Sequence, residues 1–212
     1  MSVIVKICGL KTPEAVDAAL ENGADMVGFN FFERTPRFVG IDNAALLCDR
    51  VGDRATCVGL LVDAADDAIT AIVNSVSLDL LQLHGSESPE RIAQVKTRFG
   101  LPVMKACAIS GPEDIVAART YEGIADHLLF DAKPPKGADR PGGNALAFDW
   151  HLLAGETWAC PWLLAGGLTP ENVAEAIQIS AAPGVDVSSG VEDEPGEKNL
   201  QKIAAFLTAA KA

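Results

Sequence analysis

Short apolar runs alternate with alanine-rich amphipathic stretches along the whole chain. We predict β-strands at the apolar runs, over residues 3–8, 26–30, 57–62, 78–83, 102–107, 126–131, 162–165 and 184–188. The stretches between these runs have the character of amphipathic helices. Strands that alternate with helices in this way form βα units around a parallel sheet, so the pattern predicts an α/β protein.

Three of the helical stretches begin with the same signal, a hydroxyl residue followed by proline and glutamate. They are Thr12-Pro13-Glu14, Ser88-Pro89-Glu90 and Thr169-Pro170-Glu171. The hydroxyl group can cap the helix, proline suits the first helical position, and the acidic residue is favoured by the helix dipole. Gly23 and Gly100 are expected at helix ends, where glycine is common.

Eight such units favour a closed ring over an open sheet. The chain has 212 residues, or about 26 for each unit, which is near the lower size limit of the (β/α)8 barrel. Residues 9–16 and 167–173 are similar once a single gap is allowed, as expected for a repeated unit. The alternative is an open doubly wound sheet, but neither GxGxxG nor a P-loop motif follows the first strand. We expect a single (β/α)8 TIM barrel domain over residues 1–212.

Composition and charge narrow the range of partners. Apolar residues make up 49% of the chain, enough for a large core, and 17 basic against 29 acidic residues give a net charge of −12. Such an acidic protein is not expected to bind nucleic acid or an anionic membrane. The N-terminus has no basic targeting region, and no apolar run is long enough to cross a bilayer.

The cysteines indicate a reducing compartment. The five are Cys8, Cys48, Cys57, Cys107 and Cys160. An odd number without CxxC or Cys/His ligand spacing is not typical of a disulfide framework or of a structural zinc site. We therefore expect a cytoplasmic protein.

The first predicted strand ends in Lys6-Ile7-Cys8-Gly9, at the end of a barrel where enzymes of this fold place their chemistry. Because side chains alternate along a strand, Lys6 and Cys8 face the same side. We expect the Lys6 ammonium to lower the pKa of the Cys8 thiol, which would make Cys8 a usable base or nucleophile. The alternative is that Cys8 is a small buried apolar residue.

Asp131 closes the sixth predicted strand, directly before the longest connection, residues 132–147. That connection is too rich in proline and glycine to be helical, and we interpret it as an active-site loop or lid. A carboxyl group at this place is a candidate general acid. The alternative is that Asp131 only caps the backbone that follows it.

Two glycine-containing loops follow the seventh and eighth predicted strands, where barrels often bind phosphate. The first contains Gly166 and Gly167, and the second contains Ser189 and Gly190. Glycine lets backbone amides approach phosphate oxygens, and a serine hydroxyl adds a donor. Either loop alone is more often a simple turn, but together they predict an anion site.

Two further places offer polar chemistry. The loop at residues 31–39 holds Arg34 and Arg37 among aromatic residues, and an arginine there can bind a carboxylate through paired hydrogen bonds. Gln82 and His84 share one face at the end of the fourth strand. His84 is a second-tier candidate, since a single histidine is more often a polar core residue than a catalyst.

Seven segments, in order along the chain, strongly resemble the phosphoribosylanthranilate isomerase family of tryptophan biosynthesis. They are KICGL (6–10), TPRFV (35–39), QLHG (82–85), LLFDA (128–132), GGxxxxFDW (142–150), GGLTPENV (166–173) and DVSSGVE (186–192). The resemblance covers essentially the whole chain. It implies a (β/α)8 barrel that converts N-(5-phosphoribosyl)anthranilate to 1-(2-carboxyphenylamino)-1-deoxyribulose 5-phosphate, an Amadori rearrangement without metal or organic cofactor.

The resemblance also implies roles for particular residues. Asp131 matches the general acid of the family and Cys8 its general base. Arg37 matches the arginine that pairs with the anthranilate carboxylate, and Asp186 is expected to hold a sugar hydroxyl. The phosphate-binding positions correspond to Gly166, Gly167, Ser189 and Gly190. Support of Cys8 by Lys6 is our own hypothesis.

Two departures from the family pattern accompany this match. Thr35 stands where the family often has serine, which keeps the arginine two residues later. Residues 142–145 read Gly-Gly-Asn-Ala where the family commonly has a further glycine, which puts backbone contacts from this loop in doubt.

The sequence leaves two other functions to consider. One is another phosphosugar barrel enzyme, an epimerase or a synthase, but the bases that those enzymes need do not fit Cys8 with Asp131. The other is a non-catalytic sensor of a phosphorylated ligand, which would be expected to lack one of the two catalytic groups. The sequence does not distinguish a monomer from a homodimer.

Overall fold

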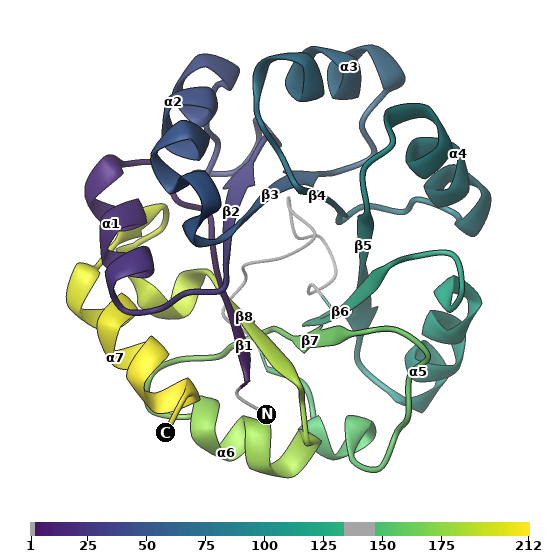
Figure 1. The fold of residues 1–212 in the computed structure, drawn as a ribbon. Helices are drawn as coiled ribbons and strands as arrows, with labels where there is room; N and C mark the ends of the chain where they lie inside the picture. Colours follow the sequence, from purple (N-terminus) through teal and green to yellow (C-terminus); the bar gives the residue numbers. More distant parts are fainter. Residues whose placement is uncertain (1–2, 134–146) are drawn as a thin grey trace.

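A computed structural model describes residues 3–133 and 147–212 of the chain. Eight parallel strands form a closed barrel in chain order (Figure 1). They are β1 (Ile4–Cys8), β2 (Met26–Asn30), β3 (Thr56–Leu61), β4 (Leu80–Leu83), β5 (Val103–Ile109), β6 (His127–Ala132), β7 (Trp162–Leu164) and β8 (Gly184–Val187). The ring closes where β8 pairs with β1, with Lys6 opposite Asp186. The predicted barrel is confirmed, and the open sheet is excluded.

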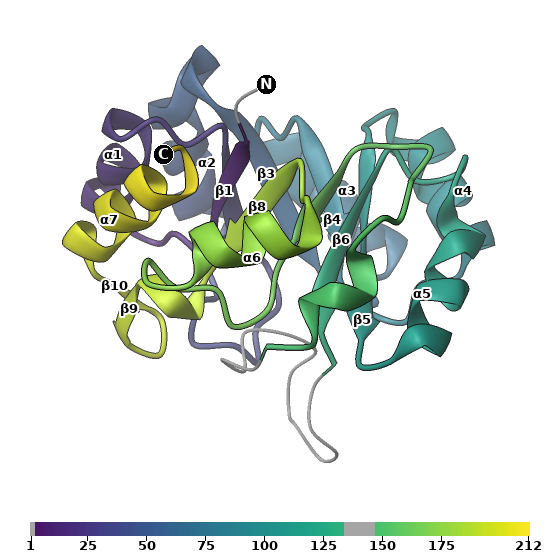
Figure 2. The same cartoon turned by 90° about the horizontal axis from the view of Figure 1, so that it is seen from below.

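Helices surround the strands on the outside of the ring (Figures 1 and 2). They are α1 (Pro13–Glu21), α2 (Ile41–Val51), α3 (Asp66–Ser75), α4 (Pro89–Phe99), α5 (Pro112–Ala118), α6 (Val173–Ser180) and α7 (Leu200–Ala210). Between β6 and β7, the described residues form only a short 3-10 helix, η3 (Trp150–Leu153). After β8 come the 3-10 turn η4 (Ser189–Val191) and a hairpin of β9 (Glu192–Glu194) and β10 (Glu197–Lys198). Within the described ranges, no helix combines the length and the apolar character that a membrane span requires.

Two of the three predicted helix starts are confirmed. Thr12 caps α1 by accepting a hydrogen bond from the Ala15 amide, and Ser88 caps α4 in the same way. The third prediction is wrong, because residues 170–172 form a turn and α6 begins only at Val173. The Asn172 side chain accepts from the Thr169 amide at 2.8 Å and donates to the Gly167 carbonyl at 3.0 Å, which stabilises that turn. Gly100 ends α4 in the left-handed conformation, as expected.

The interior of the barrel changes from apolar to polar along its axis. A small buried cluster fills the middle of the ring, with Met26, Val58, Leu80, Met104, Ala106, Leu129, Leu163 and Ala165 as its members. Ile4 packs against this cluster, so alternation along β1 also points Lys6 and Cys8 inward. The same alternation points Asp131, two residues after Leu129, inward. Polar side chains therefore gather inside the ring at the carboxyl ends of the strands.

Candidate active site

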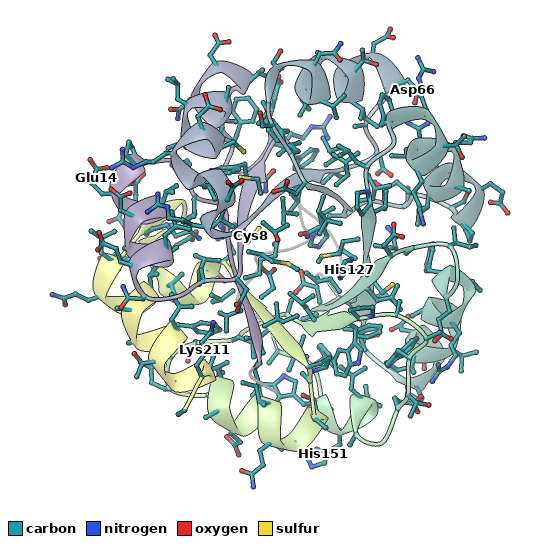
Figure 3. The ribbon with its side chains drawn as sticks, viewed as in Figure 1. Cys8, Glu14, Asp66, His127, His151 and Lys211 are labelled. Carbon is teal, nitrogen blue, oxygen red and sulfur yellow. The ribbon has the colours of Figure 1, made fainter. Side chains whose placement is uncertain are left out.

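Cys8 and Lys6 lie side by side on the inner face of β1, as predicted. Gly28 on the neighbouring strand leaves room for both, since a Cβ atom there would lie 2.8 Å from Cys8 Sγ and 3.2 Å from Lys6 Nζ. Cys8 and Gly28 are directly opposite in the β1–β2 register. Figure 3 shows Cys8 toward the centre of the ring, whereas Glu14, Asp66 and His151 lie at its periphery.

Lys6 forms a buried ion pair with Asp186 across the β1–β8 seam. Nζ lies 2.9 Å from Oδ1, and the two side chains are 0% and 9% exposed. Burial alone would lower the pKa of Lys6, but attraction to the Asp186 carboxylate and to the Cys8 sulfur outweighs it, and the pKa of Lys6 is raised. Lys6 therefore stays positively charged beside the thiol.

The expected lowering of the Cys8 pKa is wrong in its net direction. Burial raises the pKa of the thiol, and the Asp186 charge raises it further. Lys6 and Lys198 do lower it, but their effect is outweighed by burial together with Asp186. Cys8 is therefore a protonated thiol at rest, with two cations close enough to stabilise the thiolate when it forms.

Asp131 is contacted by a backbone amide and by His84. Its Oδ1 accepts from the Ala132 amide at 2.9 Å, and its Oδ2 lies 3.2 Å from His84 Nε2. Gln82 Nε2 lies 2.8 Å from His84 Nδ1. A Gln82 amide hydrogen donated to Nδ1 places the imidazole hydrogen on Nε2, which then donates to Asp131. The structure thus gives the second-tier candidate His84 a place in the site.

The loop that carries His84 is held by a buried carboxylate that sequence reasoning missed. Glu87 accepts from the Gly85 amide at 2.9 Å and from the Asp63 amide at 2.9 Å. It also pairs with Lys105 on β5, with 2.7 Å between Nζ and Oε2 and side chains 3% and 4% exposed. The backbone next to His84 is therefore fixed from both sides.

Arg37 lies at the barrel mouth, but its guanidinium already has a protein partner. Nε and Nη2 donate to the two carboxylate oxygens of Glu192, each at 2.8 Å. Gly9 makes room for the arginine, because a Cβ atom there would lie 2.9 Å from Arg37 Cδ. Lys198 Nζ donates to the same Glu192 at 2.7 Å. Sequence reasoning missed Lys198 and the Glu192 pairing, although Glu192 ends the DVSSGVE segment.

The predicted phosphate-binding loops lie next to each other. Gly166 and Gly167 have φ values of +86° and +65°, a conformation that favours glycine. The loops meet where Gly190 packs on the Leu168 carbonyl, leaving no room for a Cβ atom. Three of the predicted residues line a pocket of about 390 Å³; they are Gly167, Ser189 and Gly190. Lys202 from α7 also lines it, which sequence reasoning did not anticipate.

The site residues thus form two groups, and the predicted phosphate-binding loops after β7 and β8 lie between them. Cys8 and Asp186 belong to the β1–β8 side, and Asp131 belongs to the β4–β6 side. Gly166 bridges toward the second group, since a Cβ atom there would lie 3.0 Å from Asp131 Oδ1. The predicted lid spans residues 132–147, and residues 134–146 of it lie outside the described residues. In the part of the chain that the structure describes, no cluster of three or more His, Cys, Asp or Glu side chains is arranged to hold a metal ion.

Comparisons with known proteins agree with this geometry. A family model described as N-(5'-phosphoribosyl)anthranilate (PRA) isomerase matches residues 5–209. An N-(5'-phosphoribosyl)anthranilate isomerase from Paramagnetospirillum magneticum is 54% identical over 211 residues, covering 100% of this chain and 98% of the relative. Two solved structures of such isomerases are also similar over 99% of this chain and 98% of their own.

The first of these structures, from Thermotoga maritima, is described as monomers generated from a dimeric enzyme, and has a TM-score of 0.85 with 33% identity. The second is a complex with reduced 1-(o-carboxyphenylamino)-1-deoxyribulose 5-phosphate, with a TM-score of 0.86 and 32% identity.

Proposed function

Because the chain belongs to the N-(5'-phosphoribosyl)anthranilate isomerase family, we propose that Cys8 and Asp131 are the base and the acid of that isomerisation. The activity is an aldose-to-ketose isomerisation in tryptophan biosynthesis. One observation carries the assignment of roles: a thiol flanked by cations and a carboxyl group held by a histidine both face the inside of the same barrel mouth.

The two groups suit the two proton transfers that the reaction needs. Asp131 donates a proton to the ribose ring oxygen, the bond from that oxygen to C1 breaks, and an iminium forms on the aromatic amine. The Cys8 thiolate then removes the proton from C2, which gives an enolamine. Transfer of a proton to C1 and loss of the C2 hydroxyl proton yield the ketone. Each positioned acid or base typically contributes about 10²–10⁴-fold to the rate.

The surrounding contacts support these steps. His84 donates toward the carboxylate that Asp131 becomes after giving up its proton. Lys6 and Lys198 lower the pKa of the thiol against the effect of burial, so they favour the thiolate. Neither residue needs to touch the sugar to act in this way.

Binding both charged ends of the substrate places C1 and C2 between the acid and the base. Arg37 is proposed to bind the anthranilate carboxylate, and Asp186 a sugar hydroxyl. The phosphate is proposed to lie on backbone and hydroxyl donors of the two adjacent loops, namely Gly166, Gly167, Ser189 and Gly190. Fixing the substrate at two ends supplies the orientation on which acid–base catalysis depends.

We further propose that residues 1–212 form one domain that acts in the cytoplasm. The five cysteines, which the structure has as free thiols, support a reducing compartment. All the proposed site residues lie on one chain, so either a monomer or a homodimer is competent. The net charge of −12 supports a small-molecule substrate without a nucleic acid or membrane partner.

The test is conversion of N-(5'-phosphoribosyl)anthranilate by the purified chain. We expect the wild type to be active and Cys8→Ala and Asp131→Ala each to lower kcat by at least about 10²-fold. Cys160→Ala, which removes a half-buried thiol elsewhere, is the matched control and should keep full activity. An inactive wild type, or full activity in either of the first two variants, would contradict the proposal.

A further inference from the structure

A second lysine, Lys198, lies buried beside the proposed carboxylate site. It ends β10 in the hairpin that follows β8, and its side chain is 3% exposed. Figure 2 shows this hairpin near the N-terminal end of α7, on the side of the barrel opposite the N-terminus of the chain. Lys198 pairs with Glu192, which in turn binds Arg37, so the three residues form one buried group, the Arg37–Glu192–Lys198 cluster.

The hydrogen bonds show that Lys198 carries a positive charge. Nζ lies 2.8 Å from the Ser188 carbonyl, 2.7 Å from Glu192 Oε1 and 3.2 Å from Ser188 Oγ. The Ser188 hydroxyl donates its own hydrogen to the Cys8 carbonyl, so toward Lys198 it can only accept. Three acceptors require three N–H donors, which only the ammonium form has. The pKa of Lys198 is lowered overall, mainly by burial and also by Arg37, while the neighbouring Glu192 carboxylate opposes that effect.

Glu192 is ionised for the same reason. Its carboxylate accepts from two nitrogens of Arg37, from Lys198, and from the Gly196 amide at 3.1 Å. Burial raises the pKa of Glu192, but Arg37 and Lys198 outweigh it, and the pKa is lowered. The cluster therefore contains two cations and one anion.

Glu192 restricts how Arg37 can bind a ligand. A guanidinium has a side edge, Nε with Nη2, and an end edge, Nη1 with Nη2. The side edge is fully used by Glu192, so the end edge is the one left for a substrate carboxylate. Glu192 thereby orients Arg37, but it also cancels the arginine's charge, and a neutral pair attracts an anion only weakly.

We propose that Lys198 sets the preference of the site for a carboxylate-bearing substrate, by restoring a net charge of +1 to the Arg37–Glu192–Lys198 cluster. Its three hydrogens are committed to Ser188 and Glu192, so it acts through the cluster's charge and not by touching the substrate. The inference rests on the proposed role of Arg37 in binding the anthranilate carboxylate.

The test compares two stable ligands by calorimetry. One is reduced 1-(o-carboxyphenylamino)-1-deoxyribulose 5-phosphate, and the other is the same compound without its carboxyl group. The quantity of interest is the ratio of the two dissociation constants. Wild type should prefer the carboxylated ligand, and Lys198→Met should reduce that preference about tenfold, with little change for the other ligand.

A double variant separates charge from structure. Lys198→Met with Glu192→Gln leaves Arg37 alone with its charge, so the net charge is again +1 and the preference should return toward the wild-type ratio. A lysine that only anchors the Ser188 turn would weaken both ligands equally, and the second substitution would not restore the ratio. Either result overturns the proposal. If Lys198→Met does not fold, Lys198→Gln, which keeps two amide hydrogens but no charge, carries the same expectation.

Two further variants complete the design. Lys211→Met is the matched control, because this lysine also contacts a carbonyl and a carboxylate, those of Gly23 and Asp25, before β2. It should leave the ratio unchanged, and a changed ratio would overturn the proposal. Arg37→Met tests the premise: if it keeps the wild-type preference, the proposed carboxylate site is wrong. If Arg37→Met abolishes the preference and Lys198→Met does not, only the inference about Lys198 fails.

Discussion

The proposed base and acid have very different surroundings, although both lie on the inner face of the same barrel. Around Cys8 the neighbours are charged: Lys6 pairs with Asp186, and Lys198 pairs with Glu192. Around Asp131 the contacts come from a backbone amide and from the imidazole of His84, whose other ring nitrogen lies beside Gln82. The buried ion pairs at Cys8 flank the functional group itself, whereas the buried pair on the other side, Lys105 with Glu87, holds the loop that carries His84.

The difference follows from what each group must do. A buried thiol has a raised pKa, so it can become a thiolate only if cations stand nearby. An ammonium that is buried for this purpose needs its own carboxylate partner, since an unpaired buried charge is costly. A general acid has to be held in position without a permanent cation that would stop it from regaining its proton. The predictions below test this contrast, from the largest expected effect to the smallest.

Removing the charge beside Cys8 should cost the most stability. Lys6→Met leaves Asp186 buried without its partner, which should lower the free energy of unfolding by about 3–5 kcal/mol. Because the pKa of Lys6 is raised in the folded protein, this contribution is fully present at neutral pH and is lost only as the pH rises through the folded-state value. Urea unfolding at pH 7 measures it.

Two further variants test whether the loss of stability comes from the buried ion pair. Lys6→Met with Asp186→Asn removes both charges and should recover most of the lost stability. Lys96→Met breaks an ion pair to Asp126 whose side chains are 31% and 36% exposed, and should cost no more than about 1 kcal/mol. Equal losses in the free energy of unfolding for Lys6→Met and Lys96→Met would show that burial of the Lys6–Asp186 pair adds nothing to its contribution to stability.

The next largest effect is expected on kcat, when a substitution at Gly28 crowds the Cys8 thiol. Gly28→Ala adds a Cβ atom 2.8 Å from Cys8 Sγ, which must displace the sulfur or bend β2. A displacement near 1 Å should lower kcat roughly 10²-fold. Steady-state kinetics measure the loss, and Gly40→Ala, whose Cβ atom would meet nothing within 4 Å, is the matched control. Comparable losses in both variants would rule out crowding as the cause.

The strand positions and the barrel itself were predictable, because each depends on patterns that are local in the chain. The predicted strand 26–30 agrees with β2 at both ends. Each of the other seven predicted strands lies within two residues of the observed strand at both ends. The start of α6 was not predictable: the Thr169 hydroxyl does accept from the Glu171 amide, but residues 170–172 form a turn before the helix begins at Val173.

The partners of the site residues were much less accessible to sequence reasoning. Lys6 binds a residue 180 positions away, and Arg37 one 155 positions away. Such pairs exist only after the ring has closed. Lys198 lies in a Pro-Gly-Glu-Lys segment that has the composition of an exposed turn, and nothing local indicates that its ammonium is buried. The raised pKa of Cys8 likewise depends on burial by distant segments.

On the acid side, loss of the histidine contact should have a moderate effect. His84→Leu removes the donor to Asp131 Oδ2 and should lower kcat about tenfold with little change in KM. His84→Gln can place an amide hydrogen near the same oxygen and should recover part of the rate. His127→Leu, at the opposite end of β6, is the control and should keep the wild-type kcat. A larger change in KM than in kcat would mean that His84 binds substrate and does not position Asp131.

The smallest expected effect is a shift in the pH dependence of kcat/KM, which follows the ionisation of the Cys8 thiol. Cys8 acts as a thiolate, so kcat/KM should rise with pH toward a limit that lies above the ordinary cysteine range, as the raised pKa of the buried thiol requires. Lys6→Met should move this rise to higher pH, because Lys6 lowers the pKa. Adding Asp186→Asn should move it part of the way back, because Asp186 raises the pKa. Ultraviolet titration of the thiolate, taken as the difference from Cys8→Ser, follows the same group without turnover. If Lys6→Met leaves both the titration and the pH profile in place, the cations around Cys8 only hold the fold together, and the electrostatic contrast between the two sides of the site does not bear on catalysis.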